Sequence, residues 1–188
     1  MLWPNRSTAD RCARFVLTLA LAGLVAGCFQ PLYANRSAVD GSSVADRLRA
    51  VEVGPISNVV NGSQAARIAA ELRNALMFEL AGGAPANSPT HRLMMQMTAT
   101  QQQLIVDVTT SRPDVEQAGI NMTYSLIELS SGKTVVTGQT FSRVSYDNPG
   151  QEQRFARARG RRDAESRAGK VIAEDIRSRL ASYFIAGT

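Results

Sequence analysis

The chain has 188 residues, with 21 basic and 16 acidic side chains and only two cysteines, Cys12 and Cys28. This length predicts one domain with a sizeable core. Two cysteines exclude a disulfide-rich scaffold and a cysteine-based metal site, because Cys12 lies in an export signal and Cys28 in a lipidation motif.

The first 27 residues have the features of a secretory signal. Arg6, Arg11 and Arg14 precede the apolar run Phe15 to Val25. This run is shorter than the roughly 20 apolar residues that a transmembrane helix needs. The alternative interpretation is an uncleaved N-terminal anchor or an amphipathic helix.

The signal ends in the lipobox Val25-Ala26-Gly27-Cys28. We expect cleavage between Gly27 and Cys28, a diacylglyceryl group on the thiol, and a third acyl chain on the freed amine. Acyl chains bind a bilayer at about 0.8 kcal/mol per buried CH2, so two or three make anchoring long-lived. The prediction is a protein anchored to a membrane through Cys28, with no other cofactor.

Removal of residues 1–27 leaves 161 residues with 18 basic and 15 acidic side chains, a net charge of +3. We predict an acylated tether over residues 28–47 and a single α/β sandwich domain over residues 48–188. Residues 35–46 are rich in Ser, Asn, Gly and Asp, which indicates a loop. Phe29, directly after the lipidated cysteine, is compatible with sorting to the outer membrane.

The first elements of the domain are a strand and a helix. Residues 48–56 predict a strand that Gly54-Pro55 ends, with Leu48 and Ala50 on one face and Val51 and Val53 on the other. Asn61 is the predicted helix N-cap, with Gln64 as its capping-box partner. The helix has a single apolar stripe and is expected to stop at Gly82-Gly83. The stripe consists of Ala65, Ile68, Ala69, Leu72, Leu76 and Leu80.

Three antiparallel strands are predicted next. Apolar residues alternate over residues 93–99 and again, in the opposite phase, over residues 104–108, which indicates a bulge or break between them. Residues 109–119 are expected to be a connection, residues 120–126 a strand, residues 130–133 a tight turn, and residues 134–146 the last strand.

A long helix is predicted to close the chain, with Asn148 as its cap and Pro149 in its first turn. Gly160 and Gly169 weaken its interior by about 1 kcal/mol each, so a kink is an open possibility. We expect an α+β two-layer sandwich, with two helices on one face of an about four-stranded, largely antiparallel or mixed sheet, in the order β-α-β-β-β-α. The other face would then be open to a partner. The predicted stripe of the last helix consists of Phe155, Ala164, Ala168, Val171, Ile172, Ile176, Leu180 and Tyr183.

Two short motifs resemble the lipopolysaccharide-assembly lipoprotein E family (LptE, formerly rare lipoprotein B). These are Cys28-Phe29-Gln30-Pro31-Leu32-Tyr33 and Tyr146-Asp147-Asn148-Pro149 before a long last helix. The sequence lacks the glycine that the family has after its cysteine. The resemblance implies a small α/β sandwich that sits inside the outer-membrane β-barrel LptD, one-to-one. It also implies that the protein helps this barrel to fold and to insert lipopolysaccharide into the outer leaflet.

Five arginines, Arg154, Arg157, Arg159, Arg161 and Arg162, lie near the start of the last helix. One interpretation is a solvated helix face, partly neutralised by nearby acids. The other is contact with lipopolysaccharide phosphates or the barrel wall, because a guanidinium matches phosphate bidentately. On that hypothesis, Arg157→Ala with Arg161→Ala weakens lipopolysaccharide binding without lowering the melting temperature. Nucleic acid is excluded as a partner by the export signal and by the absence of aromatic residues between the arginines.

Signals for catalysis are weak. Gly132-Lys133-Thr134 resembles the end of a P-loop, but Ile127 stands where the motif requires glycine and a strand is expected to follow. His91 is the only histidine, so we expect a surface or strand-start residue and no metal site. No G-x-S-x-G motif occurs. Met94, Met95 and Met97 are expected to pack in the core and between strands, in preference to a binding stripe. The chain is therefore predicted not to be an enzyme.

Two functions remain open. The preferred one is an outer-membrane lipoprotein that faces the periplasm or lies in the lumen of the barrel as its partner. The alternative is a generic periplasm-facing lipoprotein that binds an anionic glycan or acts as a structural tether. An obligate barrel partner distinguishes the first from the second.

Overall fold

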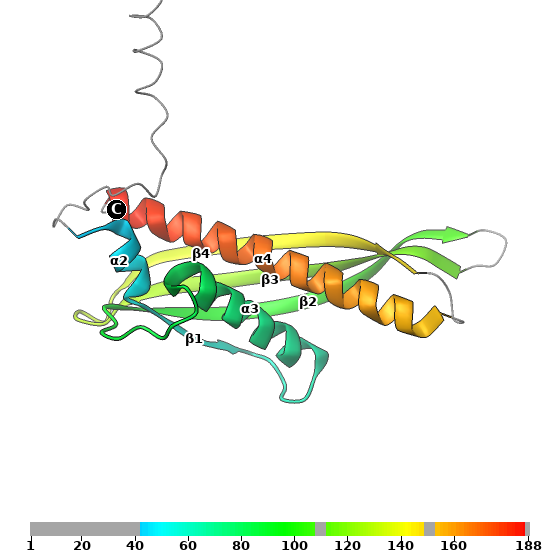
Figure 1. The fold of residues 1–188 in the computed structure, drawn as a ribbon, viewed down its shortest axis with the longest axis horizontal. Coiled ribbons are helices and arrows are strands. Elements are labelled where there is room, and N and C mark those ends of the chain that lie inside the picture. The colour runs from blue at the N-terminus through cyan, green and yellow to red at the C-terminus, as the bar shows by residue number, and fades with distance from the viewer. Residues whose placement is uncertain (1–41, 108–111, 149–152, 187–188) are drawn as a thin grey trace, which may run out of the picture. The chain divides into compact units, whose positions relative to one another are not determined.

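The structure is a computed structural model that describes residues 42–107, 112–148 and 153–186, all within the unit Ser37–Thr188. Three helices and four strands make up this part of the chain (Figure 1). In chain order they are α2 (Val44–Arg49), β1 (Val51–Ser57), α3 (Gln64–Ala81), β2 (His91–Asp107), β3 (Arg112–Glu128), β4 (Thr134–Asp147) and α4 (Arg154–Ala186).

The four strands form one mixed sheet in the order β1-β2-β3-β4. β1 runs parallel to β2, with α3 as the crossover, and the other two pairs are antiparallel. Both long helices lie on one face of the sheet (Figure 1). The predicted α+β two-layer class is confirmed, and the element order departs from the prediction only by the short helix α2.

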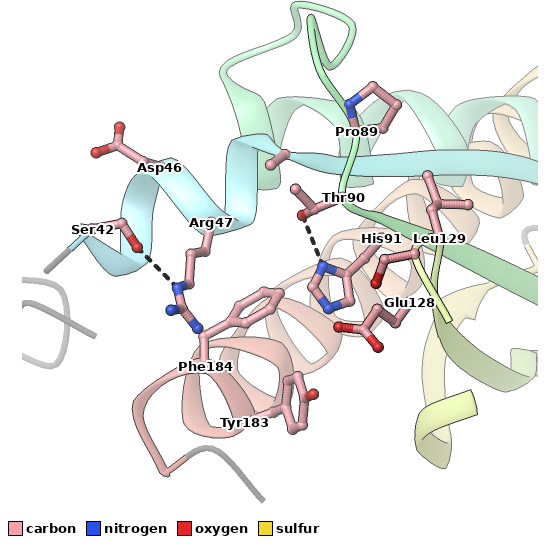
Figure 2. A pocket seen from close by; sticks show the side chains of 12 residues that line it. Ser42, Asp46, Arg47, Pro89, Thr90, His91, Glu128, Leu129, Tyr183 and Phe184 are labelled. Carbon is pink, nitrogen blue, oxygen red and sulfur yellow. Dashed lines mark hydrogen bonds between the residues drawn. The ribbon is translucent and has the colours of Figure 1, made fainter. Parts of the chain in front are cut away.

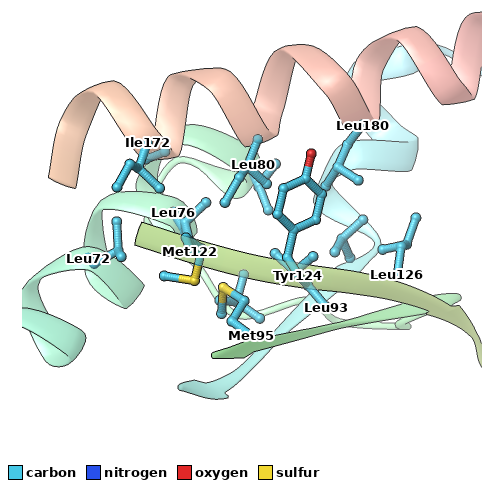
Figure 3. Packing of buried hydrophobic residues seen from close by; sticks show 14 of the residues in the cluster. Leu72, Leu76, Leu80, Leu93, Met95, Met122, Tyr124, Leu126, Ile172 and Leu180 are labelled. Carbon is cyan, nitrogen blue, oxygen red and sulfur yellow. The ribbon is translucent and has the colours of Figure 1, made fainter. Parts of the chain in front are cut away.

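The core lies between this sheet face and the two long helices (Figure 3). Strand side chains alternate between the two faces, so every second residue of β2 and β3 points towards the helices. Leu93, Met95 and Met97 come from β2, opposite Leu126, Tyr124 and Met122 of β3. The helices contribute Leu72, Leu76, Leu80, Ile172, Ile176, Leu180 and Phe184, all buried.

The N-terminal edge of the domain differs from the prediction. Leu48 lies in α2, which is capped by the side chain of Ser43, and β1 begins only at Val51. Val44 and Leu48 are buried, so one turn of helix covers the core where a strand was expected. The loop prediction for residues 35–46 is therefore wrong from Val44 onward. β1 also continues through Pro55 to Ser57, with a register shift after Val53.

The first long helix is close to its prediction. Its N-cap is Ser63, whose hydroxyl accepts the Ala66 N–H at 3.1 Å, and not Asn61. Serine is an equally good cap, and sequence alone cannot place a cap to within two residues. The predicted stop is confirmed: Gly82 is the C-cap, with a φ of 69° that favours glycine.

The β2–β3 hairpin is longer than predicted. β2 is one strand with register shifts between Gln103 and Val106, so the expected bulge is present but lies just after the predicted residues 100–103. β3 begins at Arg112, so the connection predicted for residues 109–119 is wrong over 112–119. Pro113 was interpreted as a break, but proline is tolerated near the start of a strand. The predicted turn after Glu128 and strand from Thr134 are confirmed.

Helix α4 begins at Arg154, and the predicted first-turn residue Pro149 lies outside the described residues. The expected apolar stripe is confirmed except at Phe155 and Val171, which are 89% and 51% exposed. Phe184 is buried in their place. The helix is assigned without interruption across Gly160 and Gly169.

Candidate interaction site

The predicted cleavage and lipidation residues, Gly27 and Cys28, lie outside the described residues, so the anchor stays a prediction. So does the division at residues 27 and 47, although α2 extends across the second boundary. The five arginines, by contrast, all lie in α4, where the structure separates them into two groups.

The first group, Arg157 and Arg161, faces two buried carboxylates. Arg157 Nη2 donates to Glu116 Oε1 at 2.5 Å, and Arg161 Nε lies 3.8 Å from Glu165 Oε1. Glu165 also pairs with Arg67 of α3. Arg157 therefore helps to hold α4 against the sheet. Arg161 pairs within α4, with the carboxylate that Arg67 joins to α3. The earlier expectation that Arg157→Ala and Arg161→Ala leave the melting temperature unchanged conflicts with this arrangement.

Glu116, on β3, is the centre of a polar cluster and is only 1% exposed. Its Oε2 accepts the Tyr146 hydroxyl at 2.5 Å and the Gln101 amide at 2.6 Å. Its Oε1 accepts the Asn148 amide at 3.0 Å as well as Arg157. The carboxylate thus joins β2, β3, the end of β4 and α4. Asn148 acts through this bond, six residues before the helix, and not as the predicted helix cap.

These contacts decide the protonation state of Glu116. Burial by itself raises the pKa of a carboxyl group, because it disfavours the charged form. The hydrogen bonds from Tyr146 and Gln101 and the positive charge of Arg157 outweigh burial, so the pKa of Glu116 is lowered from its ordinary value. Burial and the same carboxylate raise the pKa of Tyr146, which therefore stays a hydrogen-bond donor.

The second group, Arg154, Arg159 and Arg162, is exposed. Phe155, Arg159 and Arg162 are spaced at i, i+4 and i+7, so they lie along one face of the helix. Within the described residues, none of these three arginines has an acidic partner. The outer face of this helix end is therefore a positive surface around one exposed aromatic ring.

The sheet face opposite the helices is uncovered in the described part of the chain (Figure 1). On β2, β3 and β4 it consists of the alternate residues from Met94 to Gln102, from Gln117 to Ser125 and from Thr137 to Ser145. The ion pair between Arg92 and Glu52 lies beyond these rows, next to β1. Within the rows only Arg143 is charged, and it lies over the exposed ring of Phe141, with its guanidinium carbon 4.8 Å from the ring centre. We call these rows the open sheet face.

This composition is unusual for a solvated surface, of which about 25–35% is normally charged. Protein interfaces are depleted of Lys, Glu and Asp and enriched in Phe, Met and Arg at their centres. The open sheet face has Met94, Phe141 and Arg143 and no lysine or acid. Met95 and Met97 are buried as expected, whereas Met94 is 39% exposed and packs between strands, with its sulfur next to Gly54 of β1.

A cavity of about 650 Å³ lies at the other end of the domain, between α2, the start of β2 and the end of α4. Figure 2 shows His91 between Glu128 and the rings of Tyr183 and Phe184. The ring of His91 meets that of Phe184 edge-on, with centroids 5.2 Å apart. Burial lowers the pKa of His91, against the opposing effect of Glu128. His91 begins β2, as predicted for a strand-start residue.

The described residues give no support to metal or P-loop chemistry. They contain no group of three or more His, Cys, Asp or Glu side chains that could hold a metal ion. Lys133 is followed by β4 and not by the helix that a P-loop requires. No helix in this part of the chain combines the length and the apolar character that crossing a bilayer takes.

The fold is shared with a protein of Caulobacter crescentus CB15 that is provisionally described as a lipoprotein. The two structures have a TM-score of 0.59 and 18% identical residues over 77% of this chain and 97% of that one. Rare lipoprotein B of Shewanella oneidensis is also similar, with a TM-score of 0.49, 13% identity and coverage of 70% and 93%. A minor lipoprotein of Acinetobacter baumannii has a TM-score of 0.41 and 10% identity, over 70% of this chain and 90% of that one. No protein-family model matches the sequence, and no curated protein does.

Proposed function

We propose that this protein is a non-enzymatic lipoprotein of the outer membrane, anchored through acyl chains on Cys28. It binds an LptD-type β-barrel one-to-one and assists the assembly of that barrel and the insertion of lipopolysaccharide. The lipobox and the two family-like motifs support this proposal. The shared fold with the Caulobacter protein agrees with it, at the level of the fold alone.

The open sheet face is the observation that carries the proposal. A face of Thr, Gln, Asn and Ser side chains, with Met94, Phe141 and Arg143 among them, has the uncharged, hydrogen-bonding character of a wet protein interface. Such a surface has few charges that could repel the wall of the barrel. Its amides and hydroxyls can form hydrogen bonds to that wall directly or through water. The ring of Phe141, 63% exposed, would be its apolar anchor.

The ends of α4 suggest how the protein is oriented. α2, the first described element, lies near the C-terminal end of α4, where Arg47 and Phe184 line the same cavity. The exposed arginines lie towards the N-terminal end of α4, about 33–45 Å from Phe184 at 1.5 Å per residue. The positive end would therefore lie far from α2, where the described chain enters the domain, and Arg154, Arg159 and Arg162 would there contact lipopolysaccharide phosphates.

Charges placed on the open sheet face test the proposal. We expect Thr98→Glu with Gln139→Glu to reduce recovery of the barrel when tagged protein is extracted in mild detergent, because two carboxylates would be buried in the interface. The matched control is Ser166→Glu with Ser178→Glu, at exposed positions of α4. If both double variants fold and both still recover the barrel, the open sheet face is not the interface.

A further inference from the structure

The two edges of the sheet are protected very differently. β1, at one edge, has seven residues, contains Pro55 and shifts register after Val53. β4, at the other edge, has 14 residues and no proline, and its register shift is confined to its start. Exposed edges of soluble proteins normally carry charges, prolines or bulges that block further pairing. In β4 only Arg143 and the terminal Asp147 are charged, so this edge lacks the usual protection.

The described residues also leave room beside β4. A groove of about 510 Å³ runs between Val135, Val136 and Thr137 of β4 and Arg179, Ser182 and Tyr183 of α4. The inward row of β4 is only half-buried at Gly138, Thr140 and Val144. Helix α4 therefore covers the inner face of β4 incompletely and leaves space along this edge for the inward side chains of an added strand.

We propose that the β4 edge pairs with the β4 edge of a second copy of this chain, antiparallel, with Phe141 opposite Phe141 of the second copy. Two sheets of four strands then join into one sheet of eight, around a two-fold axis through this pair. Such a contact is isologous and closes, so it gives a dimer and no fibre. The inference concerns the chain apart from the proposed barrel and does not depend on it.

This register is the one in which β4 complements itself. Phe141 is central in β4, so nearly the whole strand is paired, and outward side chains of both copies stay on the same face. Gln139 then lies opposite Arg143 of the second copy, and Thr137 opposite Ser145 of the second copy. No like charges oppose each other, and two aromatic rings meet on the axis, which is a favourable cross-strand pair.

The length of the edge gives the contact enough hydrogen bonds. Alternate residue pairs of an antiparallel ladder exchange two bonds, so a fully paired 14-residue strand would make about 14. A typical interface between two proteins has about ten direct hydrogen bonds. The backbone alone would therefore match a standard interface.

The test uses the predicted mature chain, residues 28–188 with Cys28→Ser, so that an introduced cysteine is the only thiol. Light scattering should give twice the chain mass, and Phe141→Lys, an exposed position, should give a monomer that still unfolds cooperatively. With Phe141→Cys, mild oxidation should rapidly form a disulfide-linked dimer. The paired Cα atoms would lie about 4.5–5.5 Å apart, within the disulfide range of about 4.4–6.8 Å.

The matched control is Phe78→Cys, on α3, where Phe78 is 67% exposed. A monomeric mass at all concentrations would overturn the inference. So would a disulfide that forms no faster at residue 141 than at residue 78. A dimer that persists with Phe141→Lys would show that another surface pairs the chains, and would overturn it as well.

Discussion

Arg157 places a guanidinium nitrogen 2.5 Å from the buried carboxylate of Glu116. The Tyr146 hydroxyl and the Asn148 amide donate to the same group. The Tyr146-Asp147-Asn148 segment, one of the two motifs on which the family resemblance depends, therefore has a structural role here. It joins the end of the sheet to the beginning of the last helix.

Loss of the Arg157 guanidinium should destabilise the domain. Arg157→Ala leaves the buried Glu116 carboxylate with three neutral donors and no counter-charge, at a cost of about 1–3 kcal/mol. Arg159→Ala, two residues away and exposed, should stay within about 0.5 kcal/mol. Urea unfolding measures both. Equal urea midpoints for Arg157→Ala and Arg159→Ala would mean that the ion pair with Glu116 does not stabilise the domain.

The Glu116 cluster should also make stability depend on pH. The folded pKa of Glu116 is lowered from 4.5. The unfolded chain therefore binds more protons in this range, and stability falls as pH falls below about 4.5. Glu116→Gln should be less stable at neutral pH and should flatten this acid slope. Urea midpoints between neutral and acid pH measure the effect, and an identical slope in the variant would assign it to other carboxyl groups.

Gly138 should resist a methyl group. A Cβ there would lie 2.5 Å from the ring of Tyr124, which packs over it from β3. Overpacking of this kind costs about 1–3 kcal/mol, so Gly138→Ala should lower the melting temperature. Gly160→Ala is the control, because its Cβ would meet nothing closer than 3.7 Å. In a helix this change should stabilise by about 0.5–1 kcal/mol. A neutral Gly138→Ala would show that Tyr124 moves at little cost.

The exposed arginines should bind phosphate without contributing to the fold. Replacement of Arg154, Arg159 and Arg162 by alanine should weaken binding to lipopolysaccharide aggregates several-fold and reduce its dependence on salt. The melting temperature should stay unchanged, in contrast to Arg157→Ala. Binding can be measured by co-sedimentation. Unchanged binding in the triple variant would assign these arginines to a solvated helix face.

Local patterns in the sequence predicted much of the fold. The alternation of Leu93, Met95 and Met97 and the glycine stop after Leu80 identify a strand and a helix because each depends on near neighbours. α2 was missed because six residues offer too short a period. Residues 112–119 belong to β3 although Pro113 favours a break, because proline is tolerated near the start of a strand.

The Glu116 cluster could not be predicted in the same way. A lone glutamate in a strand carries no local sign of burial, and its partners, from Gln101 to Arg157, lie up to 41 residues away. The five arginines looked alike in sequence. Only the packing of α4 distinguishes Arg157, which faces a buried carboxylate, from Arg159, which faces outward. The low charge of the open sheet face likewise depends on the pairing of three strands, whose register no local pattern in the sequence specifies.

The most direct test of the proposed function is the composition of what is extracted from the membrane with the acylated, tagged protein in mild detergent. We predict a one-to-one complex with a large β-barrel whose electrophoretic mobility changes on heating. The protein recovered alone, still acylated at Cys28, would contradict the barrel partnership and favour a generic lipoprotein.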